Sequence, residues 1–221
     1  MIPAFDPALA RRIESSAIVA VLMVDSACDA PPLARALLAG GVRVMELTLR
    51  TPVALDALRA VRAEVPEMVA GVGTILDPGQ ISQVVEAGGA FGVSPGVNRR
   101  VLAAARETGL SFAPGIATPT DIETALEFGC RLLKFFPAEP SGGLGFLKSI
   151  AAPYAHLGVK FMPLGGIHLQ NMTAYLEDPS ICAIGGSWLA PRTLIQERAW
   201  DKITALASEA TQATRPFRQV K

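Results

Sequence analysis

One lysine of this chain stands in the middle of an apolar run, where it could act as a nucleophile. Lys134 lies within Arg131–Glu139 (RLLKFFPAE), and the leucines and phenylalanines around it predict a buried strand. Burying an ammonium ion is costly and favours the neutral amine, which can attack a carbonyl carbon and form a Schiff base. The structural alternative is a lysine at the end of the strand that extends its ammonium group into water.

A second apolar run, Val44–Thr51 (VMELTLRT), carries a glutamate and an arginine four residues apart. Because side chains alternate along a strand, Glu46, Thr48 and Arg50 share one face. An arginine suits a substrate carboxylate through paired hydrogen bonds, and the deeper Glu46 suits a general acid/base. The structural alternative is an ion pair in which Glu46 and Arg50 hold each other in the interior.

Small residues end two further apolar runs. Gly71–Thr74 (GVGT) leaves room for a ligand and offers the hydroxyl of Thr74, and Val93–Gly96 (VSPG) presents Pro95 as a flat apolar wall. Plain turns explain both segments equally well when each is taken alone.

Two glycine pairs follow the last two apolar runs. Gly165 and Gly166 form the first pair, and Gly185 and Gly186 form the second, with Ser187 directly after them. Glycine lets backbone N–H groups approach an anion closely, and the serine adds a donor. The pattern predicts a phosphate site, with two tight turns as the structural alternative.

Residues that bind metals or nucleotide cofactors are scarce. Neither of the two histidines, His156 and His168, lies in a cluster of histidines and carboxylates with metal-binding spacing. No Gly-x-Gly-x-x-Gly follows the first apolar run, and no Walker-type loop occurs. We therefore expect no nucleotide cofactor and disfavour a metal, although carboxylates alone can hold magnesium.

The composition favours a soluble protein of the cytoplasm. Twenty basic and twenty acidic residues cancel, so net charge predicts neither nucleic acid nor a membrane surface as a partner. The cysteines (Cys28, Cys130 and Cys182) form no CxxC pair, which favours a reducing compartment. We see no signal peptide, and no apolar stretch reaches the ~18 residues that span a bilayer.

Eight apolar runs alternate with helix-like segments, several of which begin near a proline and end at a glycine. This alternation predicts an α/β fold, and we expect a (β/α)8 barrel that forms a single domain over residues 1–221. A doubly wound sheet is the alternative. A short extra helix is expected before Ala17 and another after Pro191. The runs are Ala17–Val24, Val42–Leu47, Met68–Val72, Ala90–Val93, Leu110–Ala113, Arg131–Phe136, Val159–Pro163 and Ile181–Ile184. The helix-like segments include Pro31–Ala39, Pro52–Glu64, Ile81–Ala87, Arg99–Thr108 and Pro119–Phe128.

In such a barrel the functional residues lie at the carboxyl ends of the strands, where all the candidates above are found. Over residues 15 to 190 the chain resembles the 2-keto-3-deoxy-6-phosphogluconate (KDPG) aldolase / 4-hydroxy-2-oxoglutarate (KHG) aldolase family. The matching blocks are Gly41–Thr51 (GVRVMELTLRT), Gly71–Leu76 (GVGTIL), Val93–Gly96 (VSPG), Pro114–Thr118 (PGIAT), Leu133–Glu139 (LKFFPAE) and Ile184–Leu189 (IGGSWL).

The resemblance implies a trimeric barrel and a metal-free class I aldolase without a cofactor, which acts in sugar-acid breakdown such as the Entner–Doudoroff route. It implies that Lys134 forms the Schiff base with pyruvate or the keto acid and that Glu46 transfers protons. The remaining site residues follow in the same way. Arg50 and Thr74 would bind the pyruvate carboxylate, Pro95 and Phe136 would pack near the substrate, and Gly165, Gly166, Gly185, Gly186 and Ser187 would bind the distal phosphate.

One residue departs from the family pattern. Family members commonly read Pro-Thr-Gly-Gly-Ile where this chain reads Pro163–Ile167 (PLGGI), so Leu164 replaces a hydroxyl beside the expected phosphate site. Losing such a donor costs ~1–3 kcal/mol of polar recognition, which leaves the aldehyde half open. Two other functions remain as alternatives: a phosphate-binding barrel isomerase or epimerase that uses Glu46 directly, and a non-catalytic binding protein for a phosphorylated acid.

Overall fold

Parallel strands alternate with helices along the chain, as the apolar runs predict. The computed structural model describes residues 5–217, and residues 1–4 and 218–221 lie outside it. The expectation of no signal peptide therefore falls partly on residues outside the described ones. The strands are β1 (Ile18–Leu22), β2 (Val44–Thr48), β3 (Val69–Gly73), β4 (Gly92–Val93), β5 (Phe112–Ala113), β6 (Gly115–Ile116), β7 (Leu132–Phe135), β8 (Lys160–Pro163) and β9 (Ile184–Gly186). The α-helices are α1 (Pro7–Ser16), α2 (Ala30–Ala39), α3 (Ala54–Glu64), α4 (Pro78–Glu86), α5 (Arg99–Thr108), α6 (Pro119–Glu127), α7 (Gly143–Ala151), α8 (Met172–Leu176), α9 (Arg192–Gln196) and α10 (Trp200–Thr214). The 3-10 helices are η1 (Ala27–Asp29), η2 (Glu139–Ser141), η3 (Ala152–Leu157) and η4 (Arg215–Phe217).

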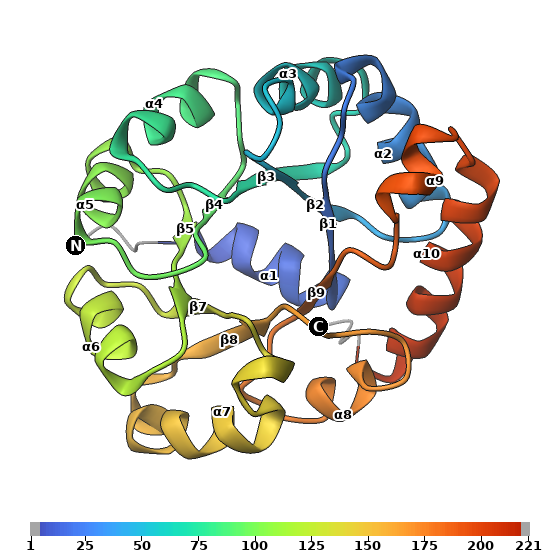
Figure 1. Ribbon diagram of the computed structural model, residues 1–221. Coiled ribbons are helices and arrows are strands. Elements are labelled where there is room, and N and C mark those ends of the chain that lie inside the picture. The colour runs from blue at the N-terminus through green and yellow to red at the C-terminus, as the bar shows by residue number, and fades with distance from the viewer. Residues whose placement is uncertain (1–4, 218–221) are drawn as a thin grey trace.

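The strands form two parallel sheets, with six strands in the order β5-β4-β3-β2-β1-β9 and three in the order β6-β7-β8. Pro114 alone separates β5 from β6, so the chain passes directly from one sheet to the other. Isolated bridges pair Phe161 with Ile181 and Leu164 with Gly185, and they connect the other two sheet edges. Helices surround the strands on the outside, whereas α1 lies within this ring (Figure 1).

Two of the predicted strands differ from the structure. The fifth apolar run was expected to be a strand from Leu110 to Ala113, but β5 begins at Phe112, and a further short strand that was not expected, β6, begins at Gly115 after Pro114, which has no N–H for a ladder. The eighth run was expected to be a strand from Ile181, but β9 begins at Ile184. Its chain changes partner there, since Cys182 N–H donates to Phe161 and Ile184 N–H donates to Ala17.

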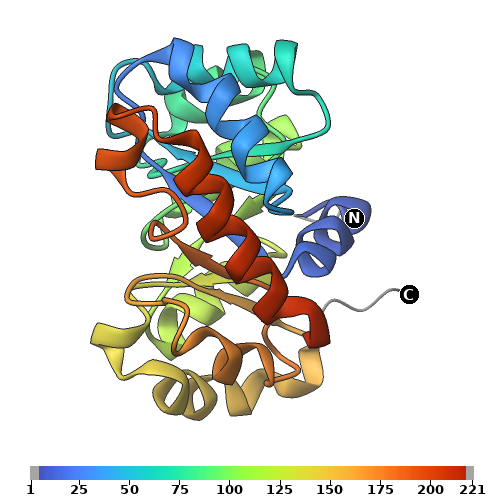
Figure 2. The same cartoon turned by 90° about the vertical axis from the view of Figure 1, so that its right-hand side faces the viewer.

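Alternate residues of each strand pack into two apolar clusters. In β2, Met45 and Leu47 join the outer cluster between the strands and the surrounding helices, and Val44 joins an inner one. Helix α1 closes the inner cluster with Ile13. Because α1 directly precedes β1, it covers the amino ends of the strands (Figure 2). The opposite, carboxyl ends therefore remain available for a site.

The helix signals in the sequence place several helices accurately. Helix α5 spans Arg99–Thr108 as predicted, because the Asn98 side chain caps its first N–H groups and Gly109 ends it in the left-handed conformation (φ 72°). Helix α1 lies before Ala17, where a helix was expected, whereas two helices, α9 and α10, follow Pro191, where one was expected. None of the helices within residues 5–217 is both long enough and apolar enough to cross a membrane.

Candidate active site

A buried lysine–glutamate pair lies at the centre of the candidate site. Lys134 on β7 and Glu46 on β2 are 88 residues apart in sequence, yet Nζ of the lysine lies 3.2 Å from Oε1 of the glutamate. Their side chains are 6% and 0% exposed, respectively. The alternative of a lysine that extends into water is therefore wrong, and so is an interior Glu46–Arg50 pair, because the carboxylate of Glu46 binds Lys134 instead.

The alternation of the strands explains why both charged groups point inward. Leu132 and Val44, two residues before Lys134 and Glu46 on their strands, belong to the inner apolar cluster. A side-chain period of two places Lys134 and Glu46 on the same inner side. Two opposite charges removed from water in this way need each other, because removing one partner of a buried pair leaves an uncompensated charge.

A glycine on the neighbouring strand makes room for the glutamate. A Cβ atom at Gly73 would lie 1.7 Å from Oε1 of Glu46, so no other residue fits without moving the carboxylate. Gly71 similarly makes room for the ring of Phe91, at 2.4 Å from its would-be Cβ. The sequence suggests that these small residues leave space for a ligand, but protein side chains occupy the space at both positions.

The second oxygen of the Glu46 carboxylate is available for chemistry. Oε2 is buried and has no hydrogen-bond partner among the described residues. An unsatisfied buried acceptor costs ~1–3 kcal/mol, and such a group in a folded protein calls for an explanation. On the other side of the pair, the ring of Phe136 has its centroid 5.3 Å from Nζ of Lys134, a cation–π contact. The pair thus has an unpaired acceptor on the glutamate and an aromatic ring against the lysine.

Two polar candidates follow neighbouring strands. Arg50 lies in the turn just after β2 and is exposed, and no ion-pair partner of its guanidinium occurs among residues 5–217. Thr74 follows β3 directly and has φ 62°, a conformation that is strained for a β-branched residue. Because β2 pairs with β3 up to Thr48 and Gly73, the two residues leave the sheet side by side. Both therefore lie at the carboxyl edge. Arg50 follows β2, which carries Glu46, and Thr74 follows β3, which packs against Glu46 through Gly73.

Pro95 lies one strand away from the lysine. A Cβ atom at Gly115 would be 2.2 Å from the Pro95 carbonyl oxygen, so the loop after β4 rests directly on β6. Gly115 in turn pairs with Lys134 across β6 and β7. The half-buried Pro95 therefore lies on the strand end next to the amine, as expected for a wall of the site.

The two glycine pairs also meet at the carboxyl edge. Gly165 and Gly166 follow β8 with φ of 94° and 82°, which only glycine adopts readily. Gly185 lies on β9 and faces Leu164, whose side chain would be 2.6 Å from a Cβ atom there. Ser187, directly after β9, is exposed. The first glycine pair thus lies in the turn after β8 and the second at the end of β9, joined by the Leu164–Gly185 bridge, and Gly185 is also needed for packing.

Leu164 itself does not point to solvent. It is 2% exposed and belongs to the inner apolar cluster, against which Phe136 packs. The side chain that replaces the family's hydroxyl is therefore part of the floor beneath the glycine loops.

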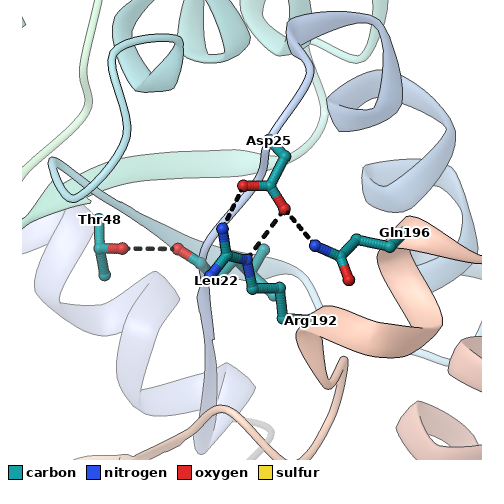
Figure 3. A network of polar contacts seen from close by, with 5 residues as sticks. All are labelled: Leu22, Asp25, Thr48, Arg192 and Gln196. Carbon is teal, nitrogen blue, oxygen red and sulfur yellow. Dashed lines mark hydrogen bonds and ion pairs between the residues drawn. The ribbon is translucent and has the colours of Figure 1, made fainter.

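A network of polar contacts ties the loop after β1 to the helix after β9 (Figure 3). The Asp25 carboxylate accepts hydrogen bonds from Nε of Arg192 at 2.9 Å and from Nε2 of Gln196 at 2.8 Å. These hydrogen bonds lower the pKa of Asp25 to about 2, and the bond from Arg192 has the largest effect. Thr48 also donates to the Leu22 carbonyl at 3.0 Å, which ties β2 to the end of β1. Sequence analysis missed this network because 167 residues separate Asp25 from Arg192.

Titratable groups do not gather into a metal-binding cluster in the part of the chain that the structure describes. No group of three or more histidine, cysteine, aspartate or glutamate side chains there is placed to hold a metal ion. The charged centre of the site is therefore the amine–carboxylate pair.

Comparison with known proteins gives consistent matches over most of the chain. The family model described as "KDPG and KHG aldolase" matches residues 9–206. The KHG/KDPG aldolase of Escherichia coli (strain K12) is 44% identical over 198 residues, which cover 90% of this chain and 92% of that protein.

Two solved structures share the fold. The KDPG aldolase from Legionella pneumophila, solved with pyruvate captured at low pH as a covalent carbinolamine intermediate, aligns with a TM-score of 0.86 and 38% identity over 91% of this chain and 97% of that chain. The 2-keto-3-deoxy-6-phosphogluconate aldolase of Zymomonas mobilis ZM4, solved with 3-phosphoglycerate, aligns with a TM-score of 0.83 and 41% identity over 91% of this chain and 94% of that chain.

Proposed function

We propose that Lys134 is the Schiff-base nucleophile of this chain and that Glu46 is its proton carrier. The chain belongs to the KDPG and KHG aldolase family and is a pyruvate-dependent class I aldolase. The reaction is the reversible cleavage of KDPG or KHG to pyruvate and an aldehyde. The observation that supports these roles is the buried pair itself, with Nζ 3.2 Å from a carboxylate oxygen at the carboxyl edge of the strands.

Formation of the Schiff base uses the proton that the pair shares. Glu46 takes a proton from the Lys134 ammonium, and the free amine attacks C2 of the keto acid. The new N–C2 bond forms as the carbonyl electrons move to oxygen, and one nitrogen proton passes to that oxygen to give a neutral carbinolamine. Glu46 then returns its proton to the hydroxyl group, which leaves as water, and the positively charged iminium remains.

Cleavage uses the iminium as an electron sink. Glu46 accepts the proton of the C4 hydroxyl, for which the unpaired Oε2 is suited, either directly or through a water. The C3–C4 bond breaks, its electrons form an enamine, and the aldehyde leaves. Glu46 gives the proton to C3 of the enamine, and water hydrolyses the iminium to pyruvate and the Lys134 ammonium. Each proton that Glu46 accepts is returned, so the pair ends as it began.

The residues around the pair orient the substrate. Arg50 and Thr74 bind the pyruvate carboxylate, supported by the free guanidinium and by the strained threonine at the edge beside it. Phe136 and Pro95 form apolar walls on either side of the reacting carbons. Fixing the carboxylate in this way makes the attack on C2 an effectively intramolecular step.

The glycine loops hold the distal phosphate of a phosphorylated substrate. Gly165, Gly166, Gly185 and Gly186 offer backbone N–H groups, and Ser187 offers a hydroxyl. The phosphorylated acid in the Zymomonas relative supports this assignment. Because Leu164 adds no donor, we infer that the backbone groups and Ser187 carry phosphate recognition in this chain.

We also propose the finer architecture and setting. The two sheets close into one (β/α)8 barrel forming a single domain over residues 1–221, with α1 as the extra N-terminal helix; the Leu164–Gly185 bridge supports this closure. The enzyme works as a homotrimer in the cytoplasm, within the Entner–Doudoroff breakdown of sugar acids. The three free cysteines are in keeping with a reducing compartment. Sedimentation analysis tests the trimer, and a monomer at micromolar concentration would contradict it.

Borohydride trapping tests the nucleophile. The protein is incubated with pyruvate and reduced, and digestion with mass analysis of the peptides is expected to place a stable adduct on Lys134. Lys134→Ala is expected to lose the adduct and turnover while it keeps the fold. Lys148→Ala is the matched control, because Lys148 is an exposed lysine that pairs with Asp178 on the surface. A folded protein that binds pyruvate without an adduct on Lys134 would overturn the assignment.

A further inference from the structure

The glutamate that ends the lysine motif has no part in the Schiff-base chemistry. Glu139 follows the loop after β7, and its carboxylate accepts a hydrogen bond from the phenol of Tyr175 on α8. Tyr175 is only 2% exposed, and burial together with this bond raises the pKa of its hydroxyl, so the phenol remains a donor. The contact joins two elements that are 36 residues apart in sequence.

The backbone around Glu139 runs along the first glycine loop. The Ala138 N–H donates to the Leu164 carbonyl at 2.7 Å, and the Glu139 N–H donates to the Gly165 carbonyl at 3.0 Å. The segment directly after Lys134 and Phe136 is therefore bonded to the segment that enters the Gly165-Gly166 turn.

The second glycine of that turn is shaped around Glu139. A Cβ atom at Gly166 would lie 2.6 Å from Cβ of Glu139, and Gly166 has a φ of 82°. From the other side, Nδ2 of Asn171 donates to the Gly166 carbonyl at 3.0 Å. The side-chain oxygen Oδ1 of Asn171 in turn accepts from the His168 N–H at 2.8 Å. The turn is thus held between a glutamate anchored by a tyrosine and an asparagine anchored by the backbone.

We propose that Glu139 and Tyr175 are positioning residues that fix the Gly165-Gly166 turn relative to Lys134, and so favour a substrate with a phosphate on its distal end. The inference rests on the proposed role of this turn in phosphate binding. Neither side chain touches the reacting carbons in this account. They set the distance between the Lys134 amine and the Gly165-Gly166 turn. This distance matters only for a substrate that contacts both the amine and the turn.

The experiment compares KDPG with KHG, which share the reacting keto acid, while only KDPG carries a phosphate. Tyr175→Phe removes one hydroxyl and leaves the packed ring in place. Its KM for KDPG is expected to rise about tenfold or more, as the loss of a hydrogen bond to a charged group predicts, while its KM for KHG and its pyruvate adduct remain near those of the wild type. Glu139→Gln keeps an acceptor and is expected to retain more KDPG affinity than Glu139→Ala.

The chain offers a matched control. The hydroxyl of Tyr154 donates to the Glu123 carboxylate at 2.9 Å, so Tyr154→Phe deletes the same kind of phenol–glutamate bond between η3 and α6. The control variant is expected to keep both KM values. An equal rise of both KM values in Tyr175→Phe, or a loss of kcat alone, would show a merely structural role and overturn the inference.

Ser187→Ala separates this inference from the proposed function. If Ser187→Ala raises the KM for KDPG and Tyr175→Phe does not, the phosphate loop stands and the positioning role is wrong. If neither variant changes the KM for KDPG, the assignment of the phosphate loop fails, and the positioning role fails with it.

Discussion

The position of the Glu46 carboxylate is set by a residue that has no side chain. Gly73 is the neighbour whose Cβ atom would lie 1.7 Å from Oε1, and Oε1 is also the atom that contacts Nζ of Lys134. The register of β2 on β3 brings the two strands together at this point. The catalytic geometry that we propose therefore depends on a contact between Glu46 and the bare backbone of Gly73.

Gly73→Ala is expected to lower kcat/KM by about 100-fold, because a displacement of ~1 Å at a catalytic group has effects of that size. Overpacking of the same space is expected to cost ~1–3 kcal/mol in the free energy of unfolding. Steady-state kinetics and thermal unfolding measure the two effects.

Gly145→Ala is the matched control for this prediction. Gly145 lies on α7 with nothing within 4 Å of a Cβ atom, so alanine there is expected to leave activity unchanged and to stabilise the helix by ~0.5–1 kcal/mol. Wild-type kinetics in Gly73→Ala would show that the carboxylate is not held by this contact.

Residue types alone predict Lys134 and Glu46, because a lone lysine in an apolar strand and a glutamate on an inward strand face are unusual. The pairing of the two could not be predicted, since it joins β2 to β7 across 88 residues. The role of Gly73 was hidden for the same reason. The sequence suggests that the space beside Gly73 is room for a ligand, but the strand register places the Glu46 side chain there.

The loops after the strands are held by polar contacts between elements that are distant in sequence. Asp25 ties the loop after β1 to α9, which follows the Gly185–Ser187 segment. Helix α5 was predicted to its ends, and Gly109 is the local signal for where it stops. The Asp25 network carries no such signal. The strand β6 was missed because it lies after Pro114, beyond the apolar run, and pairs in a different sheet from β5.

Asp25→Asn is expected to lower the melting temperature at neutral pH and to bring a smaller penalty in acid. The folded protein lowers the pKa of Asp25 from its ordinary value of 3.8 to about 2. A lowered pKa stabilises the fold above the ordinary value, and this contribution is lost as the pH falls through about 2. Thermal unfolding of wild type and variant between pH 7 and pH 2 should therefore show the difference shrinking below about pH 4.

Asp56→Asn provides the comparison for this pH series, since Asp56 is an exposed aspartate bonded to Arg59 within α3. It is expected to change the melting temperature less, because Asp56 accepts one hydrogen bond from Arg59, whereas Asp25 binds both Arg192 and Gln196. A Tm difference between wild type and Asp25→Asn that stays constant down to pH 2 would show that the ion pair is not the cause.

At the scale of the whole molecule, the strands are joined with unequal strength. β2 and β3 pair over five residues, whereas isolated bridges, Phe161–Ile181 and Leu164–Gly185, join β8 to the segment that ends in β9. The apolar periodicity predicts the parallel α/β order well, because burial decides it. It does not predict which edges are weakly paired, because single bridges depend on where Pro163 ends β8 and where the chain leaves Phe161 for β1.

This weakly paired junction is also where the Gly165-Gly166 turn meets β9, and we expect it to open more readily than the β2–β3 ladder. Amide hydrogen exchange is expected to be at least about tenfold faster for Phe161 and Cys182, whose N–H groups bond across this junction, than for residues in the middle of β2 and β3, since short ladders open with less free energy than long ones. Binding of KDPG to Lys134→Ala, which cannot turn it over, should slow exchange at the junction more than at β2, because a phosphate held by both loops ties the two edges together. Exchange at the junction as slow as at β2 without ligand would show that the two bridges close the sheet as firmly as a full ladder. Protection that KDPG extends equally over all strands would instead assign the effect to global stabilisation, and the loops would then have no special part in joining the two edges.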